Sequence, residues 1–305
     1  MRYTEERYIS LLTDFGFKRI FGTNPNKDLL IDFLNSLFDG EQVVKDVTFL
    51  NSEHVGDVRA DRKAIFDVYC ENEKGEKFIV EMQNASQKYF KDRSLYYATF
   101  PIREQAQKRE VWNYELKHVY VVALLNYDMT DSAFAQDTIN HDVGLLDKQT
   151  HRVFNDKLTF KYVEIAKFKK SIEELKTNYD KWIYVLQNLS RLDRQPRYLQ
   201  TEVFSRLFNQ AEIARFSKTE LREYEDSLKA YRDMKNSLDN AEEKGLAKGL
   251  AKGRAEGLVE GRAEGLAEGK KDKAVEIAKK LLEMDMPIDA IMKATGLSQE
   301  EITKL

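Results

Sequence analysis

The sequence predicts an α/β domain followed by an all-α extension. Strand-like runs of β-branched and aromatic residues alternate with helical patterns in the first half of the chain. Beyond about residue 170 the spacing of apolar residues is helical only. Further on, glycine recurs at every fourth position, which indicates a repeat segment attached to the globular part.

The composition limits the classes of protein to consider. The 305 residues, 42% of them apolar, are enough for a sizeable core and for more than one domain. A net charge of −3 gives no global attraction to nucleic acid, so any DNA contact requires a local basic surface. The single cysteine, Cys70, fits a reducing compartment, and we expect a cytoplasmic protein. The longest apolar run, VYVVALL at 119–125, is too short to span a membrane, so we expect no membrane partner.

The first 170 residues predict the order helix, three strands, helix and two strands. The expected elements are a helix at 26–38 that stops before Gly40, strands at 43–50, 64–70 and 77–83, a helix at 87–116 that Pro101 kinks or divides, and strands at 118–127 and 157–165. The polar, glycine-containing stretch ENEKGE joins the second and third strands. These two strands are therefore predicted to form a β-hairpin.

Three helix starts are marked in the all-α part by the S-x-x-E pattern, in which serine and glutamate side chains bind free backbone N–H groups. The pairs are Ser171 with Glu174, Ser217 with Glu220, and Ser298 with Glu301. Together these patterns predict an α/β core at 1–170, a helical extension at 171–240, a glycine-repeat segment at 241–272 and a small three-helix module at 273–305.

The repeat segment contains seven glycines with a strict period of four: Gly245, Gly249, Gly253, Gly257, Gly261, Gly265 and Gly269. Glycine in a helix costs about 1 kcal/mol relative to alanine, so an isolated helix with this sequence is poorly stable. Close packing against another helix would compensate, because glycine lets two backbones approach. We expect a homo-oligomer formed through this tail; a flexible charged spacer or a fraying helix is the alternative.

The last helices resemble a helix-turn-helix unit, with Pro287 at a helix start and Gly296 at a turn. The third helix begins with SQEEI, which places two acids where base edges and phosphates would lie. A small packing or protein-contact module is therefore the favoured interpretation, and DNA reading by this helix is disfavoured.

The candidate site lies in the hairpin. Because successive side chains of a strand point to opposite faces, Glu81 and Gln83 share one face of the second strand, while Phe78, Val80 and Met82 share the other. In a register symmetric about Lys74, paired positions sum to 148, so Asp67 lies opposite Glu81. Two facing carboxylates repel unless a cation lies between them, and oxygen ligands suit Mg²⁺. The alternative is an exposed hairpin face with two solvated acids.

The ordered set of segments resembles the PD-(D/E)XK nuclease family transposases, also known as the recombination-promoting nucleases (Rpn), over roughly residues 1–280. The segments are TDFGFKRIFG (13–22), IFDVYCENEKGEKFIVEMQ (65–83), RSLYYA (93–98) and YELKHVYVVALLNY (114–127). A glycine-repeat tail is also of a kind seen in that family. The resemblance implies a restriction-endonuclease-like core, which is a mixed central sheet flanked by helices.

The resemblance also implies roles for individual residues. Asp67 and Glu81 would hold Mg²⁺, with Mn²⁺ as an alternative, and Gln83 stands where the superfamily usually has lysine. An amide can orient a water molecule but cannot stabilise an anion as an ammonium can, so Lys63 or Lys18 would have to supply the charge. Phe66 replaces the proline that usually precedes the aspartate, which matters less because that residue only shapes the strand.

Two further groups of residues are candidates. Asp14 and Lys18, four residues apart, are a local ion pair or, by the resemblance, part of the catalytic set. Lys88, Lys91 and Arg93 are predicted to contact DNA phosphates, or else to form a solvated helix face.

The predicted function is therefore a metal-dependent DNA endonuclease that promotes recombination or transposition by hydrolysing phosphodiester bonds. The alternative is a mobile-element interaction protein of weak or no activity that oligomerises through its tail. A DNA reader that uses the last three helices is a third interpretation, and the acids of SQEEI count against it.

Overall fold

The computed structural model of the chain describes residues 6–54, 64–106, 113–129 and 136–305. The chain divides into two compact units, one ending at Lys235 and the other beginning at Asn236. The first unit contains the mixed sheet and the helices that cover it. The second contains the glycine repeat and the C-terminal helices.

The sheet of the first unit has six strands, and both parallel and antiparallel pairs occur in it. In spatial order they are β1 (Val47–Phe49), β4 (Val68–Asn72), β5 (Lys77–Gln83), β6 (Val119–Leu125), β8 (Val153–Val163) and β7 (Asn140–Leu146). The three central strands β5, β6 and β8 are parallel, and the pairs on either side are antiparallel. Two short strands, β2 (Glu53–His54) and β3 (Ala64–Ile65), pair separately.

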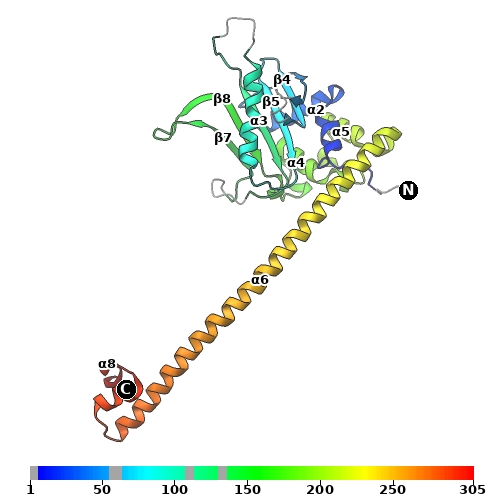
Figure 1. The fold of residues 1–305 in the computed structure, drawn as a ribbon. Helices are drawn as coiled ribbons and strands as arrows, with labels where there is room; N and C mark the ends of the chain where they lie inside the picture. Colours follow the sequence, from blue (N-terminus) through cyan, green and yellow to red (C-terminus); the bar gives the residue numbers. More distant parts are fainter. Residues whose placement is uncertain (1–5, 55–63, 107–112, 130–135) are drawn as a thin grey trace. The chain divides into compact units, whose positions relative to one another are not determined.

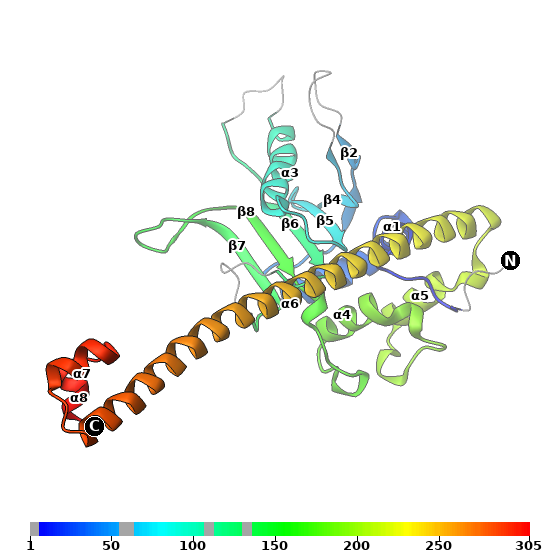
Figure 2. The same ribbon diagram turned by 60° about the horizontal axis from the view of Figure 1, so that its bottom comes forward.

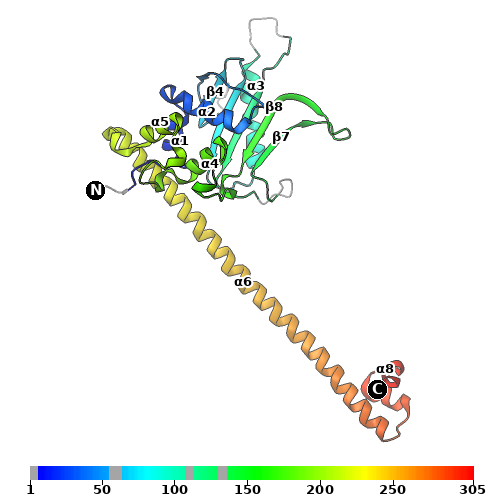
Figure 3. The same cartoon turned by 180° about the vertical axis from the view of Figure 1, so that it is seen from behind.

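Helices cover both faces of this sheet, as the α/β prediction requires. Figure 1 shows α3 (Phe90–Glu104) in front of the sheet, and the reverse view in Figure 3 shows the helices of the opposite face. These are α1 (Asp14–Phe21), α2 (Lys27–Phe38), α4 (Asn178–Asn188) and α5 (Glu202–Ala211). Each face has its own apolar cluster, so the first unit is a three-layer α/β/α sandwich.

Successive side chains of β5 point to opposite faces of the sheet and so contribute to both apolar clusters. Phe78, Val80 and Met82 point into the cluster shared with α1, α2, α4 and α5, whereas Ile79 points into the cluster beneath α3. Glu81 is on the same face as Ile79 and is only 7% exposed. The prediction of one apolar face with a polar pair on the other was therefore incomplete, because both faces of this strand are covered.

The hairpin of β4 and β5 has the predicted register. Val68 pairs with Val80 and Cys70 with Phe78, so the paired positions sum to 148. Gly75 in the connecting turn has φ of +79°, a conformation that favours glycine, and Asn72 Oδ1 accepts hydrogen bonds from two backbone N–H groups of the turn.

Three predicted elements are shorter than expected, and local contacts explain two of them. The strand predicted at 43–50 covers only β1, because Asn35 binds both the N–H and the C=O of Val44 and so occupies its ladder groups. The strand predicted at 64–70 is interrupted between β3 and β4, where Asp67 accepts a hydrogen bond from Met82 N. The helix predicted at 87–116 ends at Glu104, three residues after Pro101.

Two strands were not predicted, the two-residue β2 and the longer β7. β7 is mostly exposed and contains Gly144 and polar residues, so it lacks the apolar run of a buried strand. It pairs with the long strand β8, which extends beyond the predicted 157–165 at its start.

The helices after residue 170 follow the predicted pattern. All three S-x-x-E capping boxes form, at a short 3₁₀ helix (Ile172–Glu174), at α6 (Lys218–Glu283) and at α8 (Gln299–Thr303). Other single-turn 3₁₀ helices cover Asn24–Asn26, Ile165–Lys167, Leu189–Arg191, Arg197–Leu199 and Ile213–Arg215.

The first turns of α6 bind the segment that leads into α1. Ser10 N donates a hydrogen bond to the hydroxyl of the fully buried Tyr224 at 3.0 Å, and Phe15 N donates to Ser227 Oγ at 3.1 Å. Arg19 forms an ion pair with Glu220. The start of α6 therefore fixes the backbone on both sides of Asp14.

In the second unit, α6 is helical throughout the glycine repeat, so a flexible spacer is wrong as a description of this segment. The first of the three C-terminal helices predicted from Lys273 onward is not separate, because it is the end of α6. α7 (Ile288–Thr295) starts after Pro287 and ends at Gly296, which has φ of +74°. A small cluster around Ala278, Ile291 and Ile302 holds these helices together. In the described part of the chain, no helix has both the length and the apolar character of a membrane span.

Candidate active site at the end of the central hairpin

The two predicted carboxylates lie together where β4 and β5 diverge from their ladder. Asp67 immediately precedes β4, and its Oδ2 accepts a hydrogen bond from Met82 N at 2.9 Å. Glu81 is the residue of β5 that continues the register opposite Asp67. The strand therefore holds the side chain of Asp67 against the backbone next to Glu81.

Glu81 is a buried acid with one unsatisfied oxygen. Its Oε2 accepts a hydrogen bond from Gln83 Nε2 at 2.8 Å, whereas its Oε1 is buried without a partner among the described residues. Burial, and then the nearby charge of Asp67, raise the pKa of Glu81 to about 8. Burial also raises the pKa of Asp67, against the opposing effects of the Met82 N–H and Lys18. For both acids, the neighbouring donors and cations therefore offset only part of the cost of burying the charged form.

A guanidinium lies on the other side of Gln83. Arg93, in the first turns of α3, donates through Nη2 to Gln83 Oε1 and through Nη1 to Gln87 Oε1 at 2.6 Å. Its positive charge lowers the pKa of Glu81 and of Asp67. Gln83 thus connects the buried acid to a cation through its two amide ends.

The helix α1 contributes the second charged pair. Thr13 caps α1 by accepting from Gly16 N, and a Cβ on Gly16 would lie 2.1 Å from Ser10 O, so only glycine fits there. Asp14 and Lys18 form an ion pair with Lys18 Nζ 2.7 Å from Asp14 Oδ1. Figure 2 shows α1 near β4 and β5, and both charges of the pair act on the pKa of Asp67.

The predicted basic residues divide into two groups. Lys88 and Lys91 line a hollow beside the start of α3, and Lys88 also lines the neighbouring hollow with Arg93. Lys88 is exposed and Lys91 half-buried, whereas Arg93 is turned toward the site by its bonds to Gln83 and Gln87. The structure therefore places Arg93 with the carboxylates rather than on a solvated stripe.

The contact of Arg93 with Gln83 was missed by the sequence reasoning, which sought the missing positive charge at Lys63 or Lys18. Lys63 lies outside the described residues. Lys18 is paired with Asp14 and acts on Asp67 from a distance. A cation in the first turns of the helix that follows the E-x-Q strand was a usable signal, because such a turn begins close to the strand end.

The carboxylate pair fits a divalent cation. Oxygen donors from two acids, one with an unpartnered buried oxygen, are the ligands that Mg²⁺ and Mn²⁺ prefer. Within the described residues, no group of three or more His, Cys, Asp or Glu side chains gathers as a complete ligand set. A cation here would therefore depend on water and substrate for its remaining ligands.

Comparison with known protein families assigns both parts of the chain. Residues 11–241 match the model of the PD-(D/E)XK nuclease family transposases. Residues 271–305 match the Rpn/YhgA-like nuclease family, C-terminal HTH domain, and the two short helices of the second unit lie within that match. No curated protein and no solved structure matches the chain. With its mixed sheet, its flanking helices and a family match over most of its length, the chain belongs to the PD-(D/E)XK nuclease family transposases.

Proposed function

We propose that the chain is a metal-dependent DNA endonuclease that promotes recombination or transposition by cutting phosphodiester bonds. The observation that carries this proposal is the pairing of Asp67 with a buried Glu81 whose Oε1 has no partner among the described residues. A buried acid without compensation is costly to the fold and marks a functional site. In a nuclease family, a cation ligand is the simplest role for such a pair.

Asp67 and Glu81 would hold Mg²⁺ or Mn²⁺. When bound there, the ion would supply polarisation of the scissile phosphate and a lowered pKa of water. The chain's own residues orient these ligands. Met82 N fixes Asp67 Oδ2, and Gln83 Nε2 fixes Glu81 Oε2, so that each acid keeps one oxygen for the ligand.

Arg93 supplies the positive charge that Gln83, a neutral amide, cannot supply. Its guanidinium is held by Gln83 and Gln87, and it lies close enough to lower the pKa of both acids. A fixed positive charge at this place stabilises the extra negative charge of a phosphate under attack. Gln83 is then a positioning residue between Glu81 and Arg93, while Asp14 and Lys18 adjust the charge next to Asp67.

The proposed substrate is DNA, and the first unit makes the main contacts with it. Lys88 and Lys91 beside the site provide phosphate contacts. The C-terminal HTH domain is of a class that binds DNA, but Glu300 and Glu301 occupy the first turn of α8. Glu301 also completes the capping box of that helix. We therefore propose that α8 does not contact DNA bases in the cutting reaction.

We also propose self-association through the repeat segment. A Cβ added at any of its seven glycines meets no atom within 4 Å, so contacts in the described part of one chain give no reason for these glycines. The same segment exposes apolar side chains at Leu246, Leu250, Leu258, Val259 and Leu266. A second helix against this surface would bury them and use the close approach that glycine allows.

The alternative function is that of an interaction protein, which has the same fold but cuts DNA weakly or not at all. Gln83 in place of lysine favours an interaction protein whose tail makes the partner contacts. A nicking assay on supercoiled plasmid with Mg²⁺, Mn²⁺ or EDTA separates the two. The nuclease requires metal-dependent nicking that Asp67→Asn abolishes. If the wild-type protein leaves the plasmid intact with both metals, the nuclease proposal is wrong and the interaction-protein proposal takes its place.

A further inference from the structure

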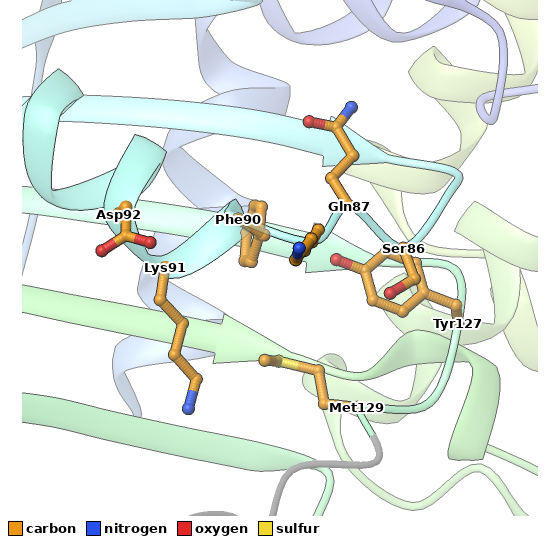
Figure 4. Close-up of a pocket in the computed structure, with 8 residues that line it drawn as sticks. Ser86, Gln87, Phe90, Lys91, Asp92, Tyr127 and Met129 are labelled. Atoms are coloured by element: carbon orange, nitrogen blue, oxygen red, sulfur yellow. The ribbon is translucent and has the colours of Figure 1, made fainter.

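A hollow of about 420 Å³ opens at the ends of β5 and β6, next to the candidate active site. The segment after β5, the start of α3 and the residues after β6 line it (Figure 4). Its polar lining comes from Ser86, Gln87, Lys88, Lys91 and Tyr127, and Asp92 is the one acid among its lining residues. Phe90 and Met129 supply an apolar floor.

The hydroxyl of Tyr127 is the first sign that this hollow takes a ligand. It is buried, and it has no hydrogen-bond partner among the described residues. Figure 4 shows it pointing toward the Phe90 side of the hollow. Burial raises the pKa of Tyr127 to about 12, so the hydroxyl keeps its proton and is a donor. A buried donor without an acceptor is uncommon, because the lost bond to water is not replaced.

The charges around Tyr127 indicate the chemistry of that acceptor. Lys88 and Lys91 bring two positive charges to the lining against the single negative charge of Asp92. The hydroxyl of Ser86 adds a further donor. The hollow also lies at the N-terminal end of α3, a helix of 15 residues whose dipole favours anions there. A phosphate group has both the acceptor oxygens for these donors and the negative charge that this lining favours.

A chain of hydrogen bonds connects the hollow to the carboxylate pair. Gln87, which lines the hollow, accepts from Arg93 Nη1. Arg93 in turn donates to Gln83, which donates to Glu81. The hollow is therefore adjacent to the proposed cutting site but shares none of its acids.

We propose that this hollow binds a phosphate group of the DNA strand other than the phosphate that is cut, with the Tyr127 hydroxyl as a donor and Lys88 and Lys91 as counter-charges. The assignment rests on the proposed nuclease function and names a contact that positions its substrate. The phosphate is either an internal phosphodiester or a terminal 5′-phosphate, since both present the same oxygen atoms.

The test measures DNA binding without cutting. Fluorescence anisotropy in EDTA compares the full chain with Tyr127→Phe, which removes one hydroxyl and keeps the ring. Tyr198→Phe, at an exposed tyrosine of the Arg197–Leu199 turn, is the matched control. Because a hydrogen bond to a charged group is lost, we expect Tyr127→Phe to bind a short duplex about tenfold more weakly. Binding by Tyr198→Phe should not change.

The lysines provide an independent measurement. Lys88→Gln and Lys91→Gln should each reduce the slope of log affinity against log salt by about 0.9, the value for one lost phosphate contact on duplex DNA. Lys148→Gln, at an exposed position between β7 and β8, should leave the slope unchanged. Equal slopes in all three variants would overturn the assignment, as would wild-type affinity in Tyr127→Phe.

Duplexes with 5′-phosphate and with 5′-hydroxyl ends identify which phosphate is bound. An equal loss for Tyr127→Phe on both assigns an internal phosphodiester, and a loss confined to the phosphorylated duplex assigns a terminal phosphate. The nuclease proposal fails separately, if wild type binds the duplex but nicks no plasmid with Mg²⁺ or Mn²⁺. Conversely, metal-dependent nicking together with unchanged binding by Tyr127→Phe would remove the phosphate site alone.

Discussion

Gln83 Nε2 donates a hydrogen bond to Glu81 Oε2 at 2.8 Å, two residues apart on one face of β5. The other end of the same amide accepts from Arg93. A lysine at this position would have no acceptor atom for Arg93, so the amide and the arginine belong to one arrangement. The positive charge next to Gln83 comes from the following helix, α3, and not from the strand.

Replacement of Arg93 by glutamine should therefore reduce cutting more than binding. Loss of one preorganised stabilising group costs about 10²-fold to 10³-fold in rate, and we expect a decrease in that range. The affinity for a duplex in EDTA should change by about tenfold or less, the effect of one hydrogen bond to a charged group. Plasmid nicking rates and anisotropy measure the two effects.

The double variant Gln83→Lys with Arg93→Gln returns a cation to the strand. We expect it to recover part of the lost nicking rate, whereas Lys88→Gln with Arg93→Gln should recover none. If the Arg93→Gln protein nicks plasmid as fast as wild type, Arg93 has no part in the reaction.

Removal of either carboxylate should separate stability from activity. Asp67→Asn and Glu81→Gln each relieve the repulsion between two poorly compensated acids, so the melting temperature in EDTA should stay or rise. An amide oxygen still accepts from Met82 N or Gln83 Nε2, so these hydrogen bonds survive. Metal-dependent nicking should be lost. Thermal melts and nicking assays on the same preparations test this.

Metal should stabilise wild type and not the two variants. A ligand at 100 times its Kd stabilises the fold by about 2.7 kcal/mol, which is readily seen as a shift in melting temperature. Asp156→Asn, at an acid whose side chain is 72% exposed, is the control and should respond to metal as wild type does. A fall of both stability in EDTA and activity would instead identify Asp67 and Glu81 as structural acids.

Glu164 should control part of the acid stability of the first unit. This fully buried carboxylate accepts from His141 Nε2, from Lys167 Nζ and from Met129 N. Burial raises its pKa, but the bonds from Lys167, Met129 N and His141 outweigh that effect and leave the pKa below its ordinary value of 4.5. Its contribution to stability is therefore complete above about pH 4.5 and is lost as the pH falls through the folded-state pKa.

The variant Glu164→Gln should lower the free energy of unfolding by about 3 kcal/mol at pH 7, since it removes one partner of a buried ionic group. The difference from wild type should narrow as the pH falls below 4.5. Urea unfolding at pH 7, 5 and 4 provides the comparison. A difference that is constant over this range would contradict the assigned role of the ionised carboxylate.

Truncation after Asn240 should lower the number of chains per particle, as measured by light scattering, and leave the first unit folded. The repeat begins at Gly245, and the contacts of Tyr224 and Ser227 with the segment before α1 remain in the truncated chain. Far-UV circular dichroism and a thermal melt report on the fold. An unchanged number of chains per particle would show that the repeat segment does not hold chains together.

The features that the sequence predicted correctly are those set by local patterns. The hairpin register follows from a short turn and the strands beside it, and the strand character of Lys77–Gln83 is visible in its β-branched and aromatic residues. Each capping box involves residues three apart. The pairing of Asp67 with Glu81 could be predicted from the sequence because both residues belong to one hairpin.

The features that were missed depend on how separate elements pack. Arg93 was assigned to a basic stripe because its direction depends on how α3 lies over the sheet. The bond between Ser10 and Tyr224 joins residues 214 positions apart, which no local pattern encodes. Val44 has a strand-like sequence, but the side chain of Asn35 occupies its backbone groups. In each case a tertiary contact overrides the local preference.

The position of the glycine repeat along α6 has a genetic consequence. Gain or loss of one four-residue unit is a change of twelve nucleotides, which keeps the reading frame. The unit that contains the candidate site ends at Lys235, before the first glycine of the repeat. Changes in copy number therefore lengthen or shorten the second unit in steps of four residues while every residue of the first unit is inherited unchanged.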